Sequence, residues 1–136
     1  MQFSQKLILV LLILALGCKK GEVKIMANGL ISEEIIIGNG SEAQDYNKVV
    51  VEYIGELEDG TVFDSSSKPG GGPYTFTLGV GSVIKGWDLG IKGMKVGGKR
   101  KLIVPSELGY GNQDMGVIPP NSKLIFIVEL MEVEVY

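Results

Sequence analysis

The sequence contains no histidine and only one cysteine. Without histidine there is no imidazole to act as a general base, which excludes the Ser-His-Asp and Cys-His arrangements of nucleophilic enzymes. Zinc sites built from cysteine and histidine are excluded as well, and so is a disulfide within one copy of the chain. Any chemistry must therefore come from carboxylates, hydroxyls, aromatic rings and the backbone.

The chain also lacks a strong charge of either sign. Its 136 residues carry 13 basic and 16 acidic side chains, which gives a net charge of −3. Domains that bind nucleic acid carry clustered positive charge, so we expect no nucleic-acid partner. The length suits one domain, and the 20 glycines indicate many tight turns between short elements.

The longest apolar run lies at the N-terminus, where Lys6 precedes the residues Leu7 to Leu16. Ten residues form a helix of about 15 Å, about half of what a hydrocarbon core requires. This length fits a cleaved signal rather than a permanent membrane span. The sequence therefore predicts a signal peptide over residues 1–17.

The single cysteine, Cys18, directly follows this run. Its position resembles that of the cysteine in a bacterial lipoprotein signal, which is diacylated and becomes the first residue of the mature chain. We therefore predict a lipidated Cys18, a tether over residues 18–29 and a protein held at the membrane of the bacterial cell envelope. Ordinary signal cleavage near Gly17, which would leave Cys18 as a spare thiol, is the alternative.

Residues 30–136 show the pattern of one β-rich domain. Short β-branched or alternating runs between turn residues predict strands at Ile31–Ile37, Lys48–Leu57, Thr61–Asp64, Tyr74–Leu78, Lys99–Val104 and Lys123–Val135. A helical spacing of three and four residues joins Ile84, Trp87, Ile91 and Met94. We therefore predict an α+β fold, an antiparallel sheet with one face on a single short helix. The glycine- and proline-rich residues 105–120 predict an irregular, ordered flap.

Three aromatic residues occupy positions that a hydrophobic core alone does not explain. Phe63 directly precedes the acidic Asp64, Trp87 points inward from the predicted helix, and Tyr110 lies between two glycines of the flap. Each also has a structural interpretation, since Phe63 and Trp87 fit a core and Tyr110 could plug a loop. These residues are candidates for a binding pocket.

Eight segments, in order, resemble the FKBP-type peptidyl-prolyl cis-trans isomerases, the macrolide-binding immunophilins. They cover the chain from about Leu30 to Glu132 and are Val51–Gly55, Asp59–Ser66, Phe76–Gly79, Val83–Trp87, Gly93–Gly97, Pro105–Gly111, Ile118–Asn121 and Leu124–Leu130. The resemblance implies a twisted antiparallel β-sheet wrapped around one short helix, in agreement with the α+β prediction from the residues.

The resemblance also implies an enzyme that rotates X–Pro peptide bonds (EC 5.2.1.8) without a covalent intermediate, a metal or a cofactor. Its catalytic residues would be Tyr53, Phe63, Asp64, Ile84, Trp87, Tyr110 and Phe126, and its further substrate-binding residues Tyr74, Val83 and Ile118. The Ile84 N–H and the Tyr110 phenol would donate to substrate carbonyls, whereas Asp64 would position substrate electrostatically. Proline-containing polypeptides would be substrates and macrolides candidate inhibitors.

This chain departs from the family's pattern in two places. The loop Ser67–Gly72 lacks the arginine that relatives often pair with the pocket aspartate, which predicts a less firmly held Asp64. The flap carries Asp114 and Met115 where well-known members have histidine and proline, which bears on macrolide affinity more than on turnover. Two other functions of the same fold stay open, a module that binds proline segments without turnover and an interaction protein of the envelope.

Overall fold

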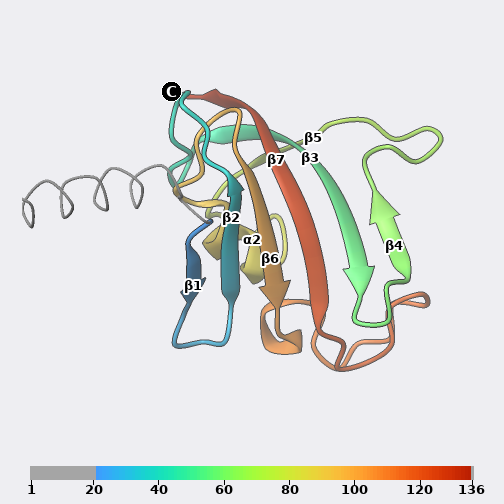
Figure 1. Cartoon of the computed structure of the whole chain (residues 1–136). Coiled ribbons are helices and arrows are strands. Elements are labelled where there is room, and N and C mark those ends of the chain that lie inside the picture. The colour runs from blue at the N-terminus through green and yellow to red at the C-terminus, as the bar shows by residue number, and fades with distance from the viewer. Residues whose placement is uncertain (1–20, 136) are drawn as a thin grey trace, which may run out of the picture.

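The computed structural model describes residues 21–135 (Figure 1). The predicted signal peptide and Cys18 lie outside these residues. In chain order the elements are β1 (Val23–Ile25), β2 (Ile31–Ile36), β3 (Lys48–Leu57), β4 (Val62–Ser65), β5 (Tyr74–Thr77), α2 (Lys85–Ile91), β6 (Lys99–Val104), the 3-10 turn η1 (Ser106–Leu108) and β7 (Leu124–Glu134). Within the described part, no helix is long and apolar enough to cross a bilayer.

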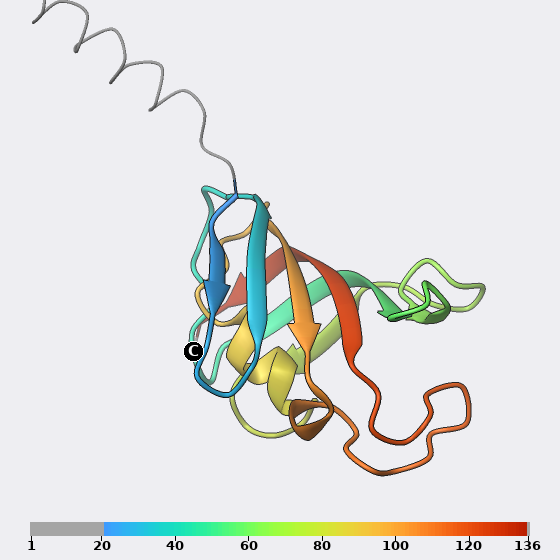
Figure 2. The same ribbon diagram turned by 60° about the horizontal axis from the view of Figure 1, so that its bottom comes forward.

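The seven strands described form one antiparallel sheet in the order β1-β2-β6-β7-β3-β4, with β5 paired to the other end of β3. The longest pairing joins β3 and β7, from Lys48 opposite Glu134 to Leu57 opposite Leu124. The sheet curves around α2, which covers its inner face (Figure 2). The predicted α+β fold is thereby confirmed.

The core lies between this inner face and the helix. Alternate residues of β3 and β7 point inward, as the period of two in their sequences predicts. Two glycines set the distance between helix and sheet, because a Cβ on Gly86 would lie 2.5 Å from Val104 Cγ1 and one on Gly90 would lie 2.7 Å from Leu102 Cδ2. Glycine at these two positions lets α2 lie directly on β6.

The C-terminal end of α2 is held by Arg100 of β6. Its Nη1 donates to the carbonyl oxygens of Gly90 and Lys92 at 2.7 and 3.1 Å, and its Nε donates to Glu34 Oε1 at 2.5 Å. The last turn of α2 contains no basic residue of its own. Arg100 therefore supplies the donors and the positive charge that the end of a helix favours.

The structure differs from the predicted tether between residues 18 and 29. Val23–Ile25 form strand β1, which pairs with β2 through Val23 opposite Glu33 and Ile25 opposite Ile31. The segment is too short for its period of two to stand out in the sequence. It forms a strand because the outer edge of β2 offers unpaired backbone groups. The described part of the domain therefore includes a strand that the sequence analysis placed in the tether.

Candidate functional site

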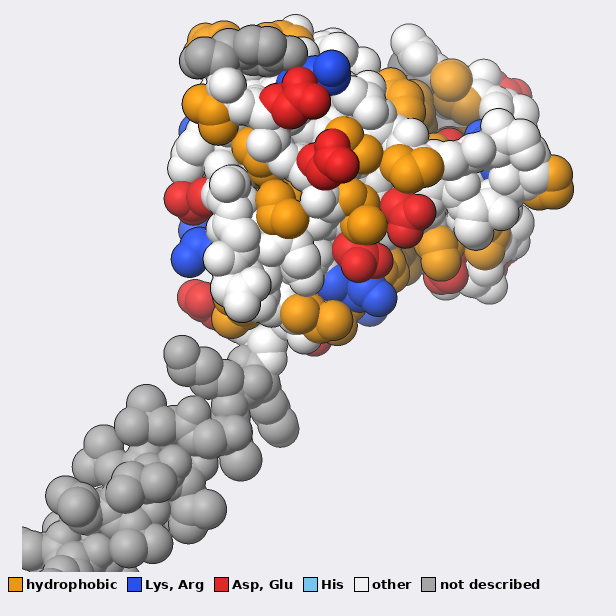
Figure 3. Space-filling model, turned by 90° about the horizontal axis from the view of Figure 1, so that it is seen from above, with side chains coloured by type: hydrophobic (Ala, Val, Ile, Leu, Met, Phe, Trp, Pro, Cys, Tyr) orange, Lys and Arg blue, Asp and Glu red, His pale blue; other side chains and the backbone are white. Residues whose placement is uncertain are grey.

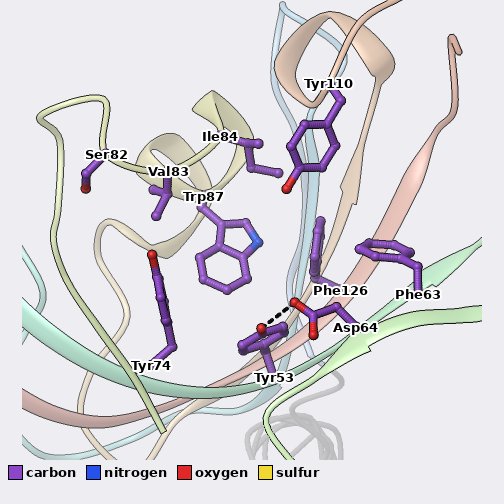
Figure 4. Close-up of a pocket in the computed structure, with 10 residues that line it drawn as sticks. All are labelled: Tyr53, Phe63, Asp64, Tyr74, Ser82, Val83, Ile84, Trp87, Tyr110 and Phe126. Carbon is purple, nitrogen blue, oxygen red and sulfur yellow. Dashed lines mark hydrogen bonds between the residues drawn. The ribbon is translucent and has the colours of Figure 1, made fainter. Parts of the chain in front are cut away.

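A pocket of about 470 Å³ opens on the inner side of the sheet, between β3, β4, α2 and the flap (Figure 4). Nine of the ten residues that were predicted to form the isomerase site line it. The lining residues are Tyr53, Phe63, Asp64, Tyr74, Ser82, Val83, Ile84, Trp87, Tyr110 and Phe126. These side chains come from five elements and two loops, so the fold itself assembles the pocket.

Aromatic rings form the floor and one wall of the pocket. Trp87 is only 5% exposed, and its ring packs edge-on against Tyr53 and Phe126 with centroid distances of 5.0 and 5.4 Å. The ring of Phe63 also packs edge-on against that of Phe126, with a centroid distance of 5.6 Å. Edge-to-face contacts of this kind stabilise a fixed arrangement of rings. The aromatic part of the pocket is therefore apolar and preformed, whereas Asp64, Ser82 and the tyrosine hydroxyls contribute polar groups.

Gly55 of β3 makes room for the wall formed by Phe63 and Phe126. A Cβ at Gly55 would lie 2.7 Å from Phe63 Cζ and 2.9 Å from Phe126 Cε1. Any larger residue there would displace one of the two rings. The glycine is thus part of the pocket although it contributes no side chain.

Asp64 is held at the polar edge of the pocket by donors from three directions. The Tyr53 hydroxyl donates to Oδ2 at 2.6 Å, whereas Lys68 Nζ and the Ser65 N–H donate to Oδ1 at 2.6 and 2.9 Å. The prediction that Asp64 is loosely held is therefore wrong. Lys68, four residues further along the chain, takes the place of the missing arginine.

These contacts fix the protonation states at this edge. Partial burial raises the pKa of Asp64, but the bonds from Lys68, Tyr53 and Ser65 outweigh it and bring the pKa below its ordinary value. Burial, together with the bond to Asp64, raises the pKa of Tyr53 far above that of a free phenol. At neutral pH the edge therefore presents a carboxylate and a neutral phenol.

Tyr110 reaches into the pocket from the flap, opposite Asp64 (Figure 4). Its ring is half-buried, and burial followed by the nearby charge of Asp64 raises the pKa of its phenol. The hydroxyl therefore stays protonated and can donate a hydrogen bond. Ile84, at the N-cap of α2, points its side chain toward the same space.

Trp87 carries the one buried side-chain polar atom without a hydrogen-bond partner among residues 21–135, its Nε1. The indole nitrogen lies on the side of the ring that faces Phe126 (Figure 4). No hydrogen-bond acceptor among the described residues therefore offsets the burial of this donor. The pocket floor therefore holds a donor that water does not reach.

Two residues differ from the sequence analysis. Ile118 is 7% exposed and belongs to the core instead of the pocket lining, because the flap folds its side chain inward. Ser82 lines the pocket but was not predicted. In the sequence, Ser82 could have been predicted only from its position directly before Val83 and Ile84, in the loop that leads into α2.

Comparison with known proteins agrees with this geometry. Residues 39–131 match the family model described as "FKBP-type peptidyl-prolyl cis-trans isomerase". The chain belongs to this family. Its domain is an FKBP-type peptidyl-prolyl cis-trans isomerase domain, and the resemblance seen in the sequence is confirmed.

Similar proteins occur in bacteria and fungi. An FK506-binding protein of Neisseria meningitidis is 57% identical over 106 residues, which cover 77% of this chain and 96% of that protein. FK506-binding protein 4 of Emericella nidulans is 51% identical over 106 residues, but these cover 78% of this chain and only 22% of the fungal protein. The chain thus spans about a fifth of the length of several fungal relatives it matches.

Solved structures of the family share the fold. FkpA from Escherichia coli superposes with a TM-score of 0.75 at 45% identity, over 82% of this chain and 51% of FkpA. AtFKBP13 superposes with a TM-score of 0.76 at 42% identity, over 83% of this chain and 99% of that protein. The described domain therefore has the architecture of complete family members.

Proposed function

We propose that this protein catalyses cis-trans isomerisation of X–Pro peptide bonds in exported proteins of the bacterial envelope. The observation that carries the proposal is the apolar pocket of about 470 Å³ with Trp87 as its floor, which fits a proline ring. Rotation about an amide transfers no proton and needs no nucleophile. A chain without histidine is therefore suited to the reaction.

The pocket lowers the barrier by favouring the twisted amide over the planar one. Resonance in the planar amide creates a barrier of about 18–20 kcal/mol and a polar carbonyl. Twisting removes the resonance, so the twisted amide loses less hydration when it enters an apolar site. Each ~1.4 kcal/mol of this difference accelerates the reaction tenfold.

In this proposal the polar groups orient the substrate. The Tyr110 phenol and the Ile84 N–H donate to substrate carbonyls, and the rings of Tyr53, Phe63 and Phe126 enclose the proline. Asp64 acts through its fixed negative charge. A carboxylate that accepts hydrogen bonds from Tyr53, Ser65 and Lys68 and has a lowered pKa is a poor base.

A refolding assay limited by proline isomerisation tests the activity on a soluble chain that starts at Lys19. We expect strong acceleration by the wild type and a loss of at least tenfold in Phe63→Ala, because the pocket wall is removed. Tyr110→Phe keeps the ring and removes one donor, which is worth about 1 kcal/mol, or about fivefold in rate.

Val62→Ala, next to Phe63 on β4 but 53% exposed, is the matched control and is expected to keep full activity. Absence of acceleration by the wild type would overturn the proposal. Tight binding of proline peptides without acceleration would instead support a binding module that uses the same pocket.

The proposed location rests on the N-terminal sequence. We propose that residues 1–17 are removed as a signal peptide and that Cys18 carries lipid, so that the isomerase domain, which begins with β1 at Val23, lies at the membrane. Labelling of growing cells with palmitate compares the wild type with Cys18→Ser. We expect label in the wild type alone, and equal labelling of both chains would exclude acylation at Cys18.

We also propose that macrolides occupy the same pocket, because several similar proteins are named FK506-binding proteins. A macrolide would compete with the proline ring for the surface of Trp87. Titration with FK506 should quench or shift the fluorescence of Trp87, the single tryptophan of the chain, and inhibit refolding catalysis in parallel. Inhibition without a change in Trp87 emission would place the macrolide elsewhere.

A further inference from the structure

Exposed aliphatic side chains gather where the described chain begins. Val23 and Ile25 of β1, Ile35 and Ile36 of β2, and Ile37 directly after β2 are each between 48% and 73% exposed. We call these five residues the anchor-proximal patch. In the face seen in Figure 3, hydrophobic side chains lie beside the point at which the grey chain joins the domain.

The strand geometry explains why these side chains share one surface. On β1, Lys24 belongs to a hollow on the inner side with Arg100, so Val23 and Ile25 point to the outer side. On β2, the register shifts between Glu34 and Ile36, and this bulge leaves both Ile35 and Ile36 exposed. The five side chains therefore lie on two paired strands and the residue after them, with Glu33 opposite Val23 on the same outer side.

Single exposed aliphatic residues are common on protein surfaces and need no explanation. This patch is unusual because it occupies a sheet edge, where natural proteins place charges that prevent association. The outer side of β1 carries only Val23 and Ile25. An apolar surface that covers these side chains would remove them from water.

The short connection to Cys18 indicates what covers them. Because β1 begins at Val23, only the four residues Lys19 to Glu22 separate it from Cys18. The five steps from Cys18 to Val23 span at most about 18 Å when the chain is extended. With Cys18 acylated as proposed above, on which this inference rests, Val23 lies within that distance of a bilayer surface.

We propose that the anchor-proximal patch rests in the headgroup region of the bilayer that holds the lipid of Cys18. Acyl chains supply the anchoring, and a small apolar contact then adds a second, weaker attachment that fixes orientation. Lys99 and Lys101 on β6 can reach lipid phosphates, although Lys99 stands opposite Glu129 of β7 and Lys101 opposite Glu33 of β2. A bilayer with some anionic lipid fits this mixture of charges.

A second copy of the chain is a weaker candidate for the occupant. Stable dimers bury about 800 Å² on each partner, more than five side chains supply. The bilayer, in contrast, is always within reach of a tethered domain, so that even a weak contact is populated.

The proposed orientation turns the pocket away from the membrane. Ile36 pairs with Lys99 at one end of β6, whereas Val104 pairs with Leu124 at the other end, where the flap with Tyr110 begins; of the patch, Ile25 alone is level with this second end, through Ile31 and Ile103. The six residues of β6 separate these ends by about 17 Å. The pocket also opens on the inner side of the sheet, opposite the outer side that carries Val23 and Ile25.

Fluorescent labelling of the acylated full chain tests the proposal. Cys18 is the only cysteine and acylation consumes its thiol, so Ile35→Cys introduces a single reactive site. Val80→Cys, equally exposed but in the loop before α2, is the matched control. Each variant carries an environment-sensitive dye and is reconstituted into vesicles of phosphatidylcholine and phosphatidylglycerol, with and without doxyl-labelled lipid.

We expect a blue-shifted emission and at least twofold quenching by doxyl lipid at position 35, and neither at position 80. Adding Ile25→Glu should reduce the quenching at position 35, whereas adding Leu89→Glu on the exposed side of α2 should not. Unchanged isomerase activity in each variant shows that the domain stays folded.

Three results would overturn the proposal and are distinguishable. Equal quenching at positions 35 and 80 in an acylated chain leaves the anchoring intact and removes the docking. A blue shift at position 35 without doxyl quenching, accompanied by cross-links between copies, identifies a second chain as the occupant. A mass spectrum without an acyl group on Cys18 refutes the anchoring together with the docking, while the refolding assay still reports the isomerase activity.

Discussion

At the scale of single residues, the carboxylate of Asp64 shows how a charge can be kept beside an apolar pocket. Its oxygen atoms accept hydrogen bonds from a phenol, an ammonium group and a backbone N–H. Each of these hydrogen bonds offsets part of the free-energy cost of removing the carboxylate from water. The charge is therefore kept at the edge of the pocket, where the proposed function uses it to orient the substrate.

The acid stability of the protein should depend on Lys68. A carboxyl whose pKa is lowered by folding stabilises the native state above its unfolded pKa, and this contribution is lost as the pH falls through the folded pKa. In Lys68→Met the pKa of Asp64 rises toward its ordinary value, so the variant should be less stable than the wild type near neutral pH, and this difference should shrink as the pH falls. The midpoint of thermal unfolding, measured between pH 2.5 and 7, checks this.

Lys92→Met is the matched control for Lys68→Met, because Lys92 makes a similarly exposed ion pair with Asp45, far from the pocket. No lowered pKa of a pocket carboxyl depends on this pair. In the control, the midpoint of thermal unfolding should change with pH on the acid side as it does in the wild type. The same pH dependence in all three proteins would refute the assigned role of Lys68.

The pocket residues differ in how far the sequence predicts them. Phe63, Trp87 and Tyr110 could be singled out because a large ring next to an acid, on a helical face or between glycines is conspicuous. The role of Lys68 could not be found, because it depends on how the loop brings Nζ to 2.6 Å from Asp64. Ile118 was misplaced since nothing local shows which way a flap residue turns.

At the scale of elements, the contact of α2 with β6 sets the position of the pocket floor. Gly86→Ala should destabilise the protein by about 1–3 kcal/mol although alanine favours helices, because the new Cβ would meet the stiff, fully buried Val104. Urea unfolding followed by Trp87 fluorescence measures the loss.

Leu89→Ala, on the exposed side of α2, is the control for Gly86→Ala and should change stability by less than about 1 kcal/mol. A Gly86→Ala protein as stable as the wild type would show that helix and sheet can move apart without cost.

Arg100 is expected to be the residue that secures the other end of α2. Arg100→Met removes the donors to Gly90 and Lys92 and leaves Glu34 without its partner, which should cost about 2–4 kcal/mol. The same urea titration measures this loss of stability. Adding Glu34→Gln should recover part of the loss, and an Arg100→Met protein with unchanged stability would contradict this role.

Most elements follow from sequence periodicity, and the exception has a physical cause. The predicted strands Lys48–Leu57 and Lys99–Val104 agree with β3 and β6, because each run contains β-branched residues and lies between turn residues. β1 has only three residues and exists through its pairing with β2. Pairing partners are distant in sequence, so a single segment cannot reveal them.

At the scale of the whole molecule, β1 is an addition at the rim of the sheet. A chain that starts at Ala27 should keep its isomerase activity within about twofold, because no residue of β1 lines the pocket. We expect a stability loss of about 1–2 kcal/mol from the lost pairing with β2 and the lost packing of Met26.

The refolding assay and urea unfolding together check the shortened chain. Full activity with reduced stability is the expected pair of results. Loss of activity in a chain that remains folded would show that β1 influences the pocket through the sheet.

The pairing of β7 with β3 has a consequence for how the activity arises. β7 contributes Phe126 and places it opposite Gly55, between β6 and β3 in the sheet. A polypeptide that ends before Leu124 thus lacks the surface that would enclose a pyrrolidine. Fragments truncated there should therefore be inert in the refolding assay.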